Sequence, residues 1–217
     1  MKRLYIVVEG QTEEEFVVSV LRPYFSSKGL YNITPIVIRT SAAGKGGFVK
    51  YAHLRNRIND ILRSGSQDFI VTTMVDYFRC PELPGEEKWN KIVNHKERVA
   101  LMERCISDDI QDVRFIPYIQ LHEFEALLFS SSSGFTTYFS DKEAKEAISI
   151  INEFSNPEDI NTSPKGAPSK RLIKIRPKYD KITEGNLIAL EVGIENMMTK
   201  CRHFKAWIDK LLEVCLC

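Results

Sequence analysis

Short apolar runs alternate with amphipathic stretches through the first 130 residues. Residues 4–8 form a continuous apolar run, which predicts a strand buried on both faces. Three further β-rich runs, at residues 35–40, 69–75 and 114–119, predict three more strands. Strands that alternate with helices are joined by right-handed crossovers, so the pattern indicates a doubly wound, mainly parallel α/β sheet.

The stretches between these runs carry apolar residues at helical spacing. They predict helices over about 13–22, 48–63 and 94–107. Thr12 and Glu15 match a capping box at the start of the first helix, and Pro23 should end it.

The pattern changes after Ser130, where convincing β-rich runs stop. Ser140 and Glu143 match a capping box before a helix that reaches Phe154, and residues 186–200 and 204–214 have helical patterns. We therefore expect an α/β core over residues 1–130 and a mainly helical appendage over residues 131–217. The appendage should pack on the core as one compact unit and cover one side of its cleft.

Composition limits the function classes. The 217 residues carry a net charge of +1, which argues against nucleic-acid binding through bulk positive charge but leaves room for a local basic patch. The longest apolar runs are far too short to cross a membrane, and no signal peptide opens the chain, so we expect a cytoplasmic protein. Five cysteines without a CxxC pair are typical of reduced thiols.

Acidic residues follow the predicted strands. Glu9 comes directly after the first strand and Asp76 after the third, while Glu123 and Glu125 follow the fourth. Glu13 lies one helical turn beyond Glu9. Ligands of open α/β sheets bind beyond the carboxyl ends of the strands, and clustered carboxylates repel one another unless a cation joins them. Oxygen ligands of this kind suit Mg²⁺ or Mn²⁺.

Each of these residues also has a purely structural interpretation. Acids at a helix start favour the helix dipole, which accounts for Glu13. Glu123 and Glu125 lie two positions apart and would point in different directions on a helix. His122, beside these acids, is either a general acid or base or a structural histidine. Glu9 and Asp76 are harder to explain structurally, because a carboxylate that directly follows a buried strand needs a partner.

Two basic segments could contact phosphate. Lys45 lies in a glycine-rich loop after the second strand, which places it at the same rim of the sheet, although a flexible loop is the simpler interpretation. Lys170, Arg171 and Lys174 belong to a basic run in which Lys170, Lys174 and Lys178 would align on one helix. Such a run is either a contact for a nucleic-acid backbone or a solvated helix face.

Several of these motifs carry a family resemblance. Val7-Val8-Glu9-Gly10-Gln11-Thr12-Glu13 resembles the opening motif of TOPRIM domains, especially those of overcoming-lysogenization-defect nucleases, and Val75-Asp76 resembles the first half of the TOPRIM Asp-x-Asp motif. The longer pattern resembles a bacterial domain-of-unknown-function family, numbered 4276, over nearly the whole chain. Its parts are Glu-Gly-x-Thr-Glu, Val-Asp-Tyr, Leu-His-Glu-Phe-Glu-Ala-Leu-Leu-Phe, Ala-Pro-Ser-Lys-Arg-Leu and Cys-x-His-Phe-x-x-Trp.

The resemblance implies a TOPRIM-like core with a mainly parallel four-stranded sheet flanked by helices. It implies that Glu9 is a metal ligand or general base, and that Glu13 and Asp76 are further metal ligands. The second acid of Asp-x-Asp falls on Phe78 in this chain. Either an acid within residues 121–125 replaces it, or metal binding is weakened.

Two functions follow from the residues and the resemblance together. The first is a metal-dependent nuclease of a bacterial defence or DNA-processing system, with Mg²⁺ or Mn²⁺ as cofactor and DNA or RNA as substrate. Because the chain is too short to include the ATPase of the lysogenization-defect nucleases, a separate ATPase would be its partner. The second is a catalytically degenerate effector module that docks on such an ATPase. Both predict that Glu9 and Asp76 end adjacent parallel strands.

Overall fold

The computed structural model describes residues 2–38, 50–64, 68–77, 82–160 and 166–217. Its strands are β1 (Arg3–Val8), β2 (Ile33–Val37), β3 (Phe69–Asp76), β4 (Phe115–Ile116) and β5 (Ile119–Gln120). Its helices up to residue 130 are α1 (Gln11–Phe16), the π-helix η1 (Val17–Leu21), α2 (Arg22–Ser27), α3 (Tyr51–Arg63), α4 (Glu86–Trp89), α5 (His95–Ile110) and the 3₁₀ helix η3 (Phe124–Ser130). The later helices are α6 (Ser133–Tyr138), α7 (Asp141–Glu153), the 3₁₀ helix η4 (Pro157–Asp159), α8 (Pro168–Ile175), α9 (Thr183–Val192), α10 (Ile194–Lys200) and α11 (Arg202–Leu216).

The strands form one parallel sheet in the order β2-β1-β3-β4, and β5 also pairs with β3. β1 lies between β2 and β3, with Val8 opposite Met74. The predicted fold class, an α/β protein with a mainly parallel four-stranded sheet flanked by helices and followed by C-terminal helices, is confirmed.

The fourth predicted strand, residues 114–119, is divided into β4 and β5, which both run beside β3. Pro117 lies between them and has no N–H to donate. The Thr73 hydroxyl takes over part of the ladder, because it accepts from the Tyr118 N–H and donates to the Tyr118 carbonyl, both at 2.8 Å. The strand therefore continues past the proline as two short pieces.

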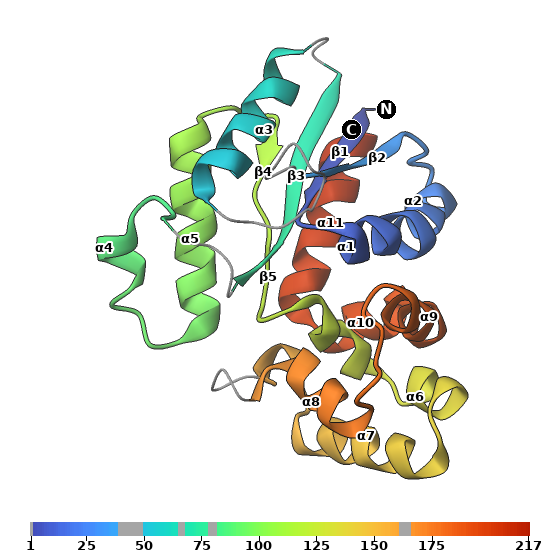
Figure 1. The fold of residues 1–217 in the computed structure, drawn as a ribbon. Helices are drawn as coiled ribbons and strands as arrows, with labels where there is room; N and C mark the ends of the chain where they lie inside the picture. The colour runs from blue at the N-terminus through green and yellow to red at the C-terminus, as the bar shows by residue number, and fades with distance from the viewer. Residues whose placement is uncertain (1, 39–49, 65–67, 78–81, 161–165) are drawn as a thin grey trace.

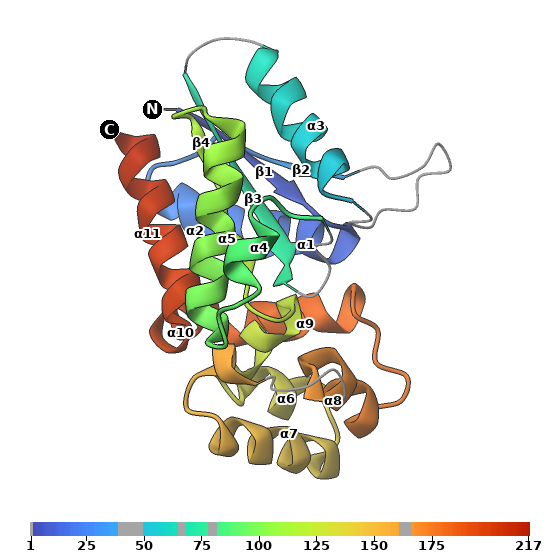
Figure 2. The same cartoon turned by 90° about the vertical axis from the view of Figure 1, so that its left-hand side faces the viewer.

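Helices cover both faces of the sheet (Figures 1 and 2). Leu4 and Ile6 of β1 pack with α1, η1, α2 and α11 on one face. Val7 and Val71 pack with α3 and α5 on the other. Because both faces of the sheet are covered, every residue of the central strand β3 is buried, and β1 and β3 are mostly apolar.

The first helical stretch differs from its prediction at both ends. It begins at Gly10, whose N–H donates to the Glu13 carboxylate at 3.0 Å, so the predicted box of Thr12 and Glu15 is wrong. It also continues past Pro23 to Ser27 as α1, η1 and α2. The π-helical turn η1 comes directly before α2, and Pro23 lies in the first turn of α2. The wider turn interrupts the regular α-helical hydrogen bonds there, so the missing N–H of Pro23 breaks none of them.

Every element that the structure describes after Gln120 is helical. α6, α7 and α8 lie beyond the carboxyl ends of the strands, whereas α11 returns to the sheet (Figures 1 and 2). The Trp207 indole of α11 donates to the Thr72 hydroxyl at 2.8 Å, and the Lys2 N–H donates to the Cys215 carbonyl at 3.0 Å. One buried cluster joins β1 to helices α6, α7 and α9. The division at residue 130 stays a prediction.

The C-terminal helices, the membrane expectation and the cysteines remain to be compared with the sequence. The predicted helix over residues 186–200 is interrupted at Gly193, whose φ of 76° separates α9 from α10. Within the described ranges, no helix is long and apolar enough to cross a membrane. The cysteines at 105, 201, 215 and 217 are free, and Cys80 lies outside the described residues.

Candidate functional site

Two acids end neighbouring strands at the carboxyl edge of the sheet. Glu9 follows β1 directly, and Asp76 is the last residue of β3, which pairs with β1 in parallel register. Both side chains are buried. The prediction that these residues terminate adjacent strands is therefore confirmed.

Glu13 joins them from the first turn of α1. Its Oε2 accepts the Gly10 N–H at 3.0 Å, so this carboxylate caps its own helix and is also buried beside the strand ends. Its negative charge raises the pKa of Asp76. Glu13 therefore both caps α1 and belongs to the group of acids at the strand ends.

The 3₁₀ helix η3 adds the carboxylate of Glu125 to the site and also binds the carboxylate of Asp76. The Phe124 N–H, at the start of η3, donates to Asp76 Oδ1 at 3.2 Å. Glu125 is 0% exposed, and burial raises the pKa of its carboxyl. Because η3 is a 3₁₀ helix that starts at residue 124, Glu123 precedes it and points elsewhere while Glu125 turns inward.

Lys181 is the member of the site that sequence reasoning missed. Its Nζ lies 3.3 Å from Glu125 Oε2, and the side chain is 35% exposed. Burial alone lowers the pKa of Lys181, but Glu125, Asp76, Glu13 and Glu123 outweigh it and raise the pKa. Lys181 lies in the connection between α8 and α9, where no motif or periodicity marks it, so the helical region supplies a cation to the acids of the α/β core.

The pKa of Asp76 depends on burial and on the charges of the neighbouring side chains. Burial raises its pKa well above the ordinary range, Glu13 raises it further, and Glu9 and Glu125 add to the effect. Lys181 opposes them but does not cancel them. The four acids therefore retain an excess of negative charge around Asp76, which a further cation would relieve.

A divalent metal fits this site by donor chemistry. The available ligands are carboxylate oxygens, which Mg²⁺ and Mn²⁺ prefer, and Lys181 is the cation that now pairs with Glu125. In the part of the chain that the structure describes, no three His, Cys, Asp or Glu side chains already stand together as a metal site. Metal binding would therefore require these carboxylates to draw closer.

Glu123 has a contact that the sequence did not predict. Its Oε2 accepts the Ser169 N–H at 3.0 Å, in the first turn of α8. This bond caps α8 and joins the α/β core to the helical region. The charge of Glu123 also helps to raise the pKa of Lys181 and of Glu125, and its predicted role as a metal ligand stays a prediction.

His122 lies behind the acids in a buried aromatic cluster. Its Nε2 lies 3.1 Å from the Glu158 carbonyl, so Nε2 must carry the hydrogen. Its ring meets those of Tyr77 and His95 edge-on. Burial, reinforced by His95, lowers the pKa of His122 to about 4, which favours the neutral ring. The predicted role of His122 as a general acid or base stays a prediction. At φ 68°, His122 is a strained turn residue whose contact with Glu158 orients the loop that leads to η3.

Comparison with known proteins places the chain in a family. Residues 8–212 match the description "Domain of unknown function (DUF4276)". The chain belongs to this family. Its structure is similar to the "C-terminal region of the Burkholderia pseudomallei OLD protein", with 13% identity, a TM-score of 0.45, and coverage of 98% of this chain and 99% of that chain. A search of curated proteins finds no match.

The predicted phosphate contacts of this DUF4276 chain divide into three groups. Lys45 lies outside the described residues. Lys170 and Lys174 are exposed on α8, which ends at Ile175 and does not continue to Pro177, so Lys178 does not share a helix with them. Arg171 is occupied within the fold, because it donates to the Gly166 carbonyl at 2.9 Å and lies over the Phe154 ring.

Proposed function

We propose that this DUF4276 chain is a metal-dependent nuclease that hydrolyses phosphodiester bonds in DNA or RNA. The observation that carries the proposal is a group of four buried acids near the carboxyl ends of β1 and β3, namely Glu9, Glu13, Asp76 and Glu125. Burial raises the pKa of Asp76, and the charges of the other three acids raise it further. Such an arrangement is costly for a purely structural site and useful for a cation-binding one. TOPRIM-like chemistry, implied by the motifs around Glu9 and Asp76, agrees with this interpretation.

The residues have separate roles in this proposal. Glu9, Glu13, Asp76 and Glu125 would hold Mg²⁺ or Mn²⁺. A metal bound there lowers the pKa of a coordinated water and stabilises negative charge on phosphate oxygens. Lys181, part-exposed beside Glu125, would bind a non-bridging phosphate oxygen as a point charge once the acids turn toward the metal.

The nucleic-acid backbone would approach over the helical side of the site. Lys170 and Lys174 present two exposed ammonium groups on α8, whose start is bound to Glu123 of the core. Lys45 would add a contact from the loop after β2. These contacts carry charge but no base specificity, so binding should weaken steeply as salt rises.

A second candidate is the degenerate effector module that docks on a separate ATPase. Two observations favour it. Phe78 stands where a second acid of an Asp-x-Asp pair would be, and Lys181 already occupies Glu125 as an ion-pair partner. In that case the acids and Lys181 form a structural ion cluster, and neither metal nor nucleic acid is needed.

The variant Glu9→Gln separates the two candidates. We expect the purified wild type to cleave single- or double-stranded DNA or RNA with Mn²⁺ or Mg²⁺, and Glu9→Gln to lose at least about a hundredfold in rate. Glu14→Gln is the matched control, because Glu14 is a nearby acid in the first turn of α1 but is not among the charges that act on Asp76. Equal activity in the three proteins would contradict the proposed role of Glu9.

Thermal unfolding supplies a readout that needs no substrate. Mg²⁺ should raise the melting temperature of wild type and Glu14→Gln, and raise that of Glu9→Gln much less. Without metal, Glu9→Gln should be no less stable than wild type, because it removes repulsion from the cluster. A large loss of stability in Glu9→Gln together with no effect of Mg²⁺ on any protein would favour the structural cluster.

A further inference from the structure

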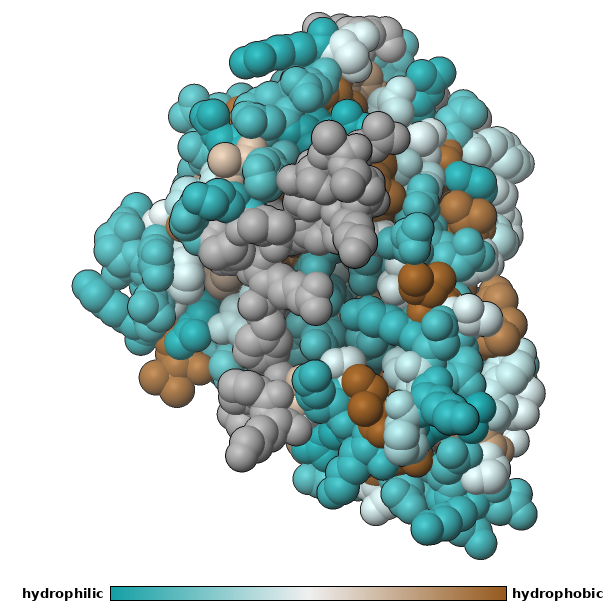
Figure 3. Space-filling view, in the orientation of Figure 1, coloured by the Kyte–Doolittle hydropathy of each residue, from teal (hydrophilic) through white to brown (hydrophobic). Residues whose placement is uncertain are grey.

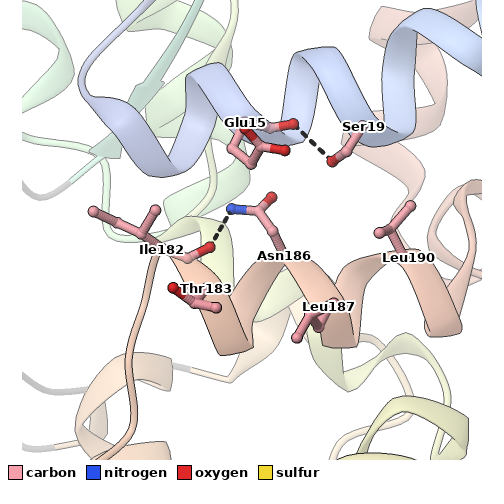
Figure 4. A pocket seen from close by; sticks show the side chains of 7 residues that line it. All are labelled: Glu15, Ser19, Ile182, Thr183, Asn186, Leu187 and Leu190. Carbon is pink, nitrogen blue, oxygen red and sulfur yellow. Dashed lines mark hydrogen bonds between the residues drawn. The ribbon is translucent and has the colours of Figure 1, made fainter.

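A groove on the opposite side of α1 from the strand ends has features of a protein-binding surface. It lies between α1–η1 and α9 and has a volume of about 330 Å³ (Figure 4). We define this α1–α9 groove by its lining residues, which are Glu15, Ser19, Ile182, Thr183, Asn186, Leu187 and Leu190. Figure 3 shows apolar surface gathered between the first helices and α9, on a face that is otherwise largely hydrophilic.

α9 is apolar beyond the face it buries. Its inner side packs Ile188, Ala189 and Val192 into the core. Its outer side exposes Leu187 and Leu190, and Leu190 is 49% exposed. A helix that is apolar around most of its circumference is normally covered on both sides, so the outer side of α9 indicates a missing contact.

Asn186 and Glu15 place two acceptors in the groove. The Asn186 Nδ2 donates to the carbonyls of Thr12 and Ile182, at 3.2 and 2.9 Å. These two carbonyls fix the orientation of the amide, because a flipped amide would bring three acceptors together. Its Oδ1 is therefore buried without a hydrogen bond, although Asn186 is only 4% exposed, and Glu15 adds a carboxylate above it. A buried acceptor without a donor is costly, which points to a donor supplied from outside.

The charge of the groove comes from α1. Among its lining residues Glu15 carries a carboxylate, and none is Lys or Arg. The occupant must therefore combine a cationic donor with apolar side chains. A twofold dimer through this groove would bring no cation to Glu15, because the lining residues include no Lys or Arg, and this disfavours a second copy of the chain as occupant.

We propose that the α1–α9 groove binds a short amphipathic helix of a partner protein, with apolar side chains one turn apart and an Arg or Lys between them. The apolar side chains cover Leu187 and Leu190, as in other helix-in-groove complexes. The cation pairs with Glu15 and donates to Asn186 Oδ1. This proposal does not depend on nuclease activity, since no member of the groove belongs to the acidic cluster.

The test uses a defined probe, a helical peptide of about 15 residues with two Leu one turn apart and a central Arg. Matched peptides replace this Arg by Gln or Glu. NMR titration of the full chain should shift resonances of α1, η1 and α9, and the Glu peptide should bind at least about tenfold more weakly than the Arg peptide. Leu190→Asp should weaken the Arg peptide by about tenfold or more, and Glu15→Arg should reverse the preference between the charged peptides.

Control variants and contrary outcomes complete the test. Glu191→Arg changes charge elsewhere on α9, and Leu216→Asp changes an exposed leucine of α11 outside the groove, so neither should alter peptide affinity. Equal binding of the three peptides, or shifts that map away from the groove, would overturn the proposal. Concentration-dependent dimerisation that Leu190→Asp abolishes would identify a second copy as the occupant and would also overturn it.

Discussion

Replacing Lys181 by Met removes the cation from the acidic cluster while keeping most of the side-chain volume. At the 3.3 Å separation of Lys181 Nζ and Glu125 Oε2, two unit charges attract by about 5 kcal/mol at an effective dielectric constant of about 20. Lys181 is 35% exposed, so solvent screening and side-chain entropy reduce this value. Because Glu125 is fully buried and loses its partner, we expect a loss of about 2–3 kcal/mol in the free energy of unfolding.

Urea unfolding of a double-mutant cycle isolates this interaction. The cycle comprises wild type, Lys181→Met, Glu125→Gln and the double variant. Because the double variant lacks both charges, it should be more stable than the sum of the two single losses predicts, with a coupling energy of about 2 kcal/mol. Lys178→Met is the matched control, since Lys178 is exposed, and its effect should stay within about 0.5 kcal/mol.

The cycle also has a clear contrary result. If the two single effects add within about 0.5 kcal/mol, Lys181 and Glu125 do not act on each other and the ion pair is a surface contact of no consequence. Mg²⁺ provides a second comparison. Lys181→Met removes a competitor for Glu125, so Mg²⁺ should stabilise this variant at least as strongly as wild type.

Two further predictions concern the join between the α/β core and α11. Glu158→Ala should destabilise the protein by about 2–4 kcal/mol in urea unfolding. The buried carboxylate of Glu158 accepts the N–H groups of His203 and Phe204 at the start of α11, at 3.1 and 2.9 Å. An unchanged unfolding midpoint would show that water replaces the carboxylate. Burial lowers the pKa of His203, but the hydrogen bond and charge of Glu103 outweigh it and raise the pKa. The His203–Glu103 pair therefore stabilises the fold below the ordinary histidine pKa of about 6.5 and loses this contribution as pH rises through the raised value. Wild type should exceed Glu103→Gln in stability mainly at mildly acidic pH, and a difference that grows toward alkaline pH would contradict the assignment.

The strand ends were predictable from sequence because parallel topology fixes them. A buried apolar strand that ends in an acid places this acid at the carboxyl edge of the sheet. Because β1 and β3 are parallel neighbours, Glu9 and Asp76 lie at the same edge. The capping box at Ser140 and Glu143 was predictable for a similarly local reason, and the structure has it.

The remaining features depend on contacts that a local pattern does not contain. Pro23 lies in the first turn of α2, directly after the π-helical turn η1, so the helix continues to Ser27. Glu123 and Glu125 look alike in sequence, and the start of η3 gives their side chains different directions. Glu123 contacts α8, whereas the charge of Glu125 acts on Asp76. Lys181 comes from a connection far along the chain, and its role exists only because the helical region folds over the strand ends.

The most direct test of the proposed metal site is a crystal of the full chain soaked in Mn²⁺ and measured at the manganese absorption edge. The account predicts an anomalous peak bound by carboxylates among Glu9, Glu13, Asp76 and Glu125, with oxygen–metal distances of about 2.0–2.3 Å and Lys181 moved off Glu125. It is contradicted if the acids hold no peak at millimolar Mn²⁺ and Lys181 still lies against Glu125, because the ion pair alone would then account for the cluster.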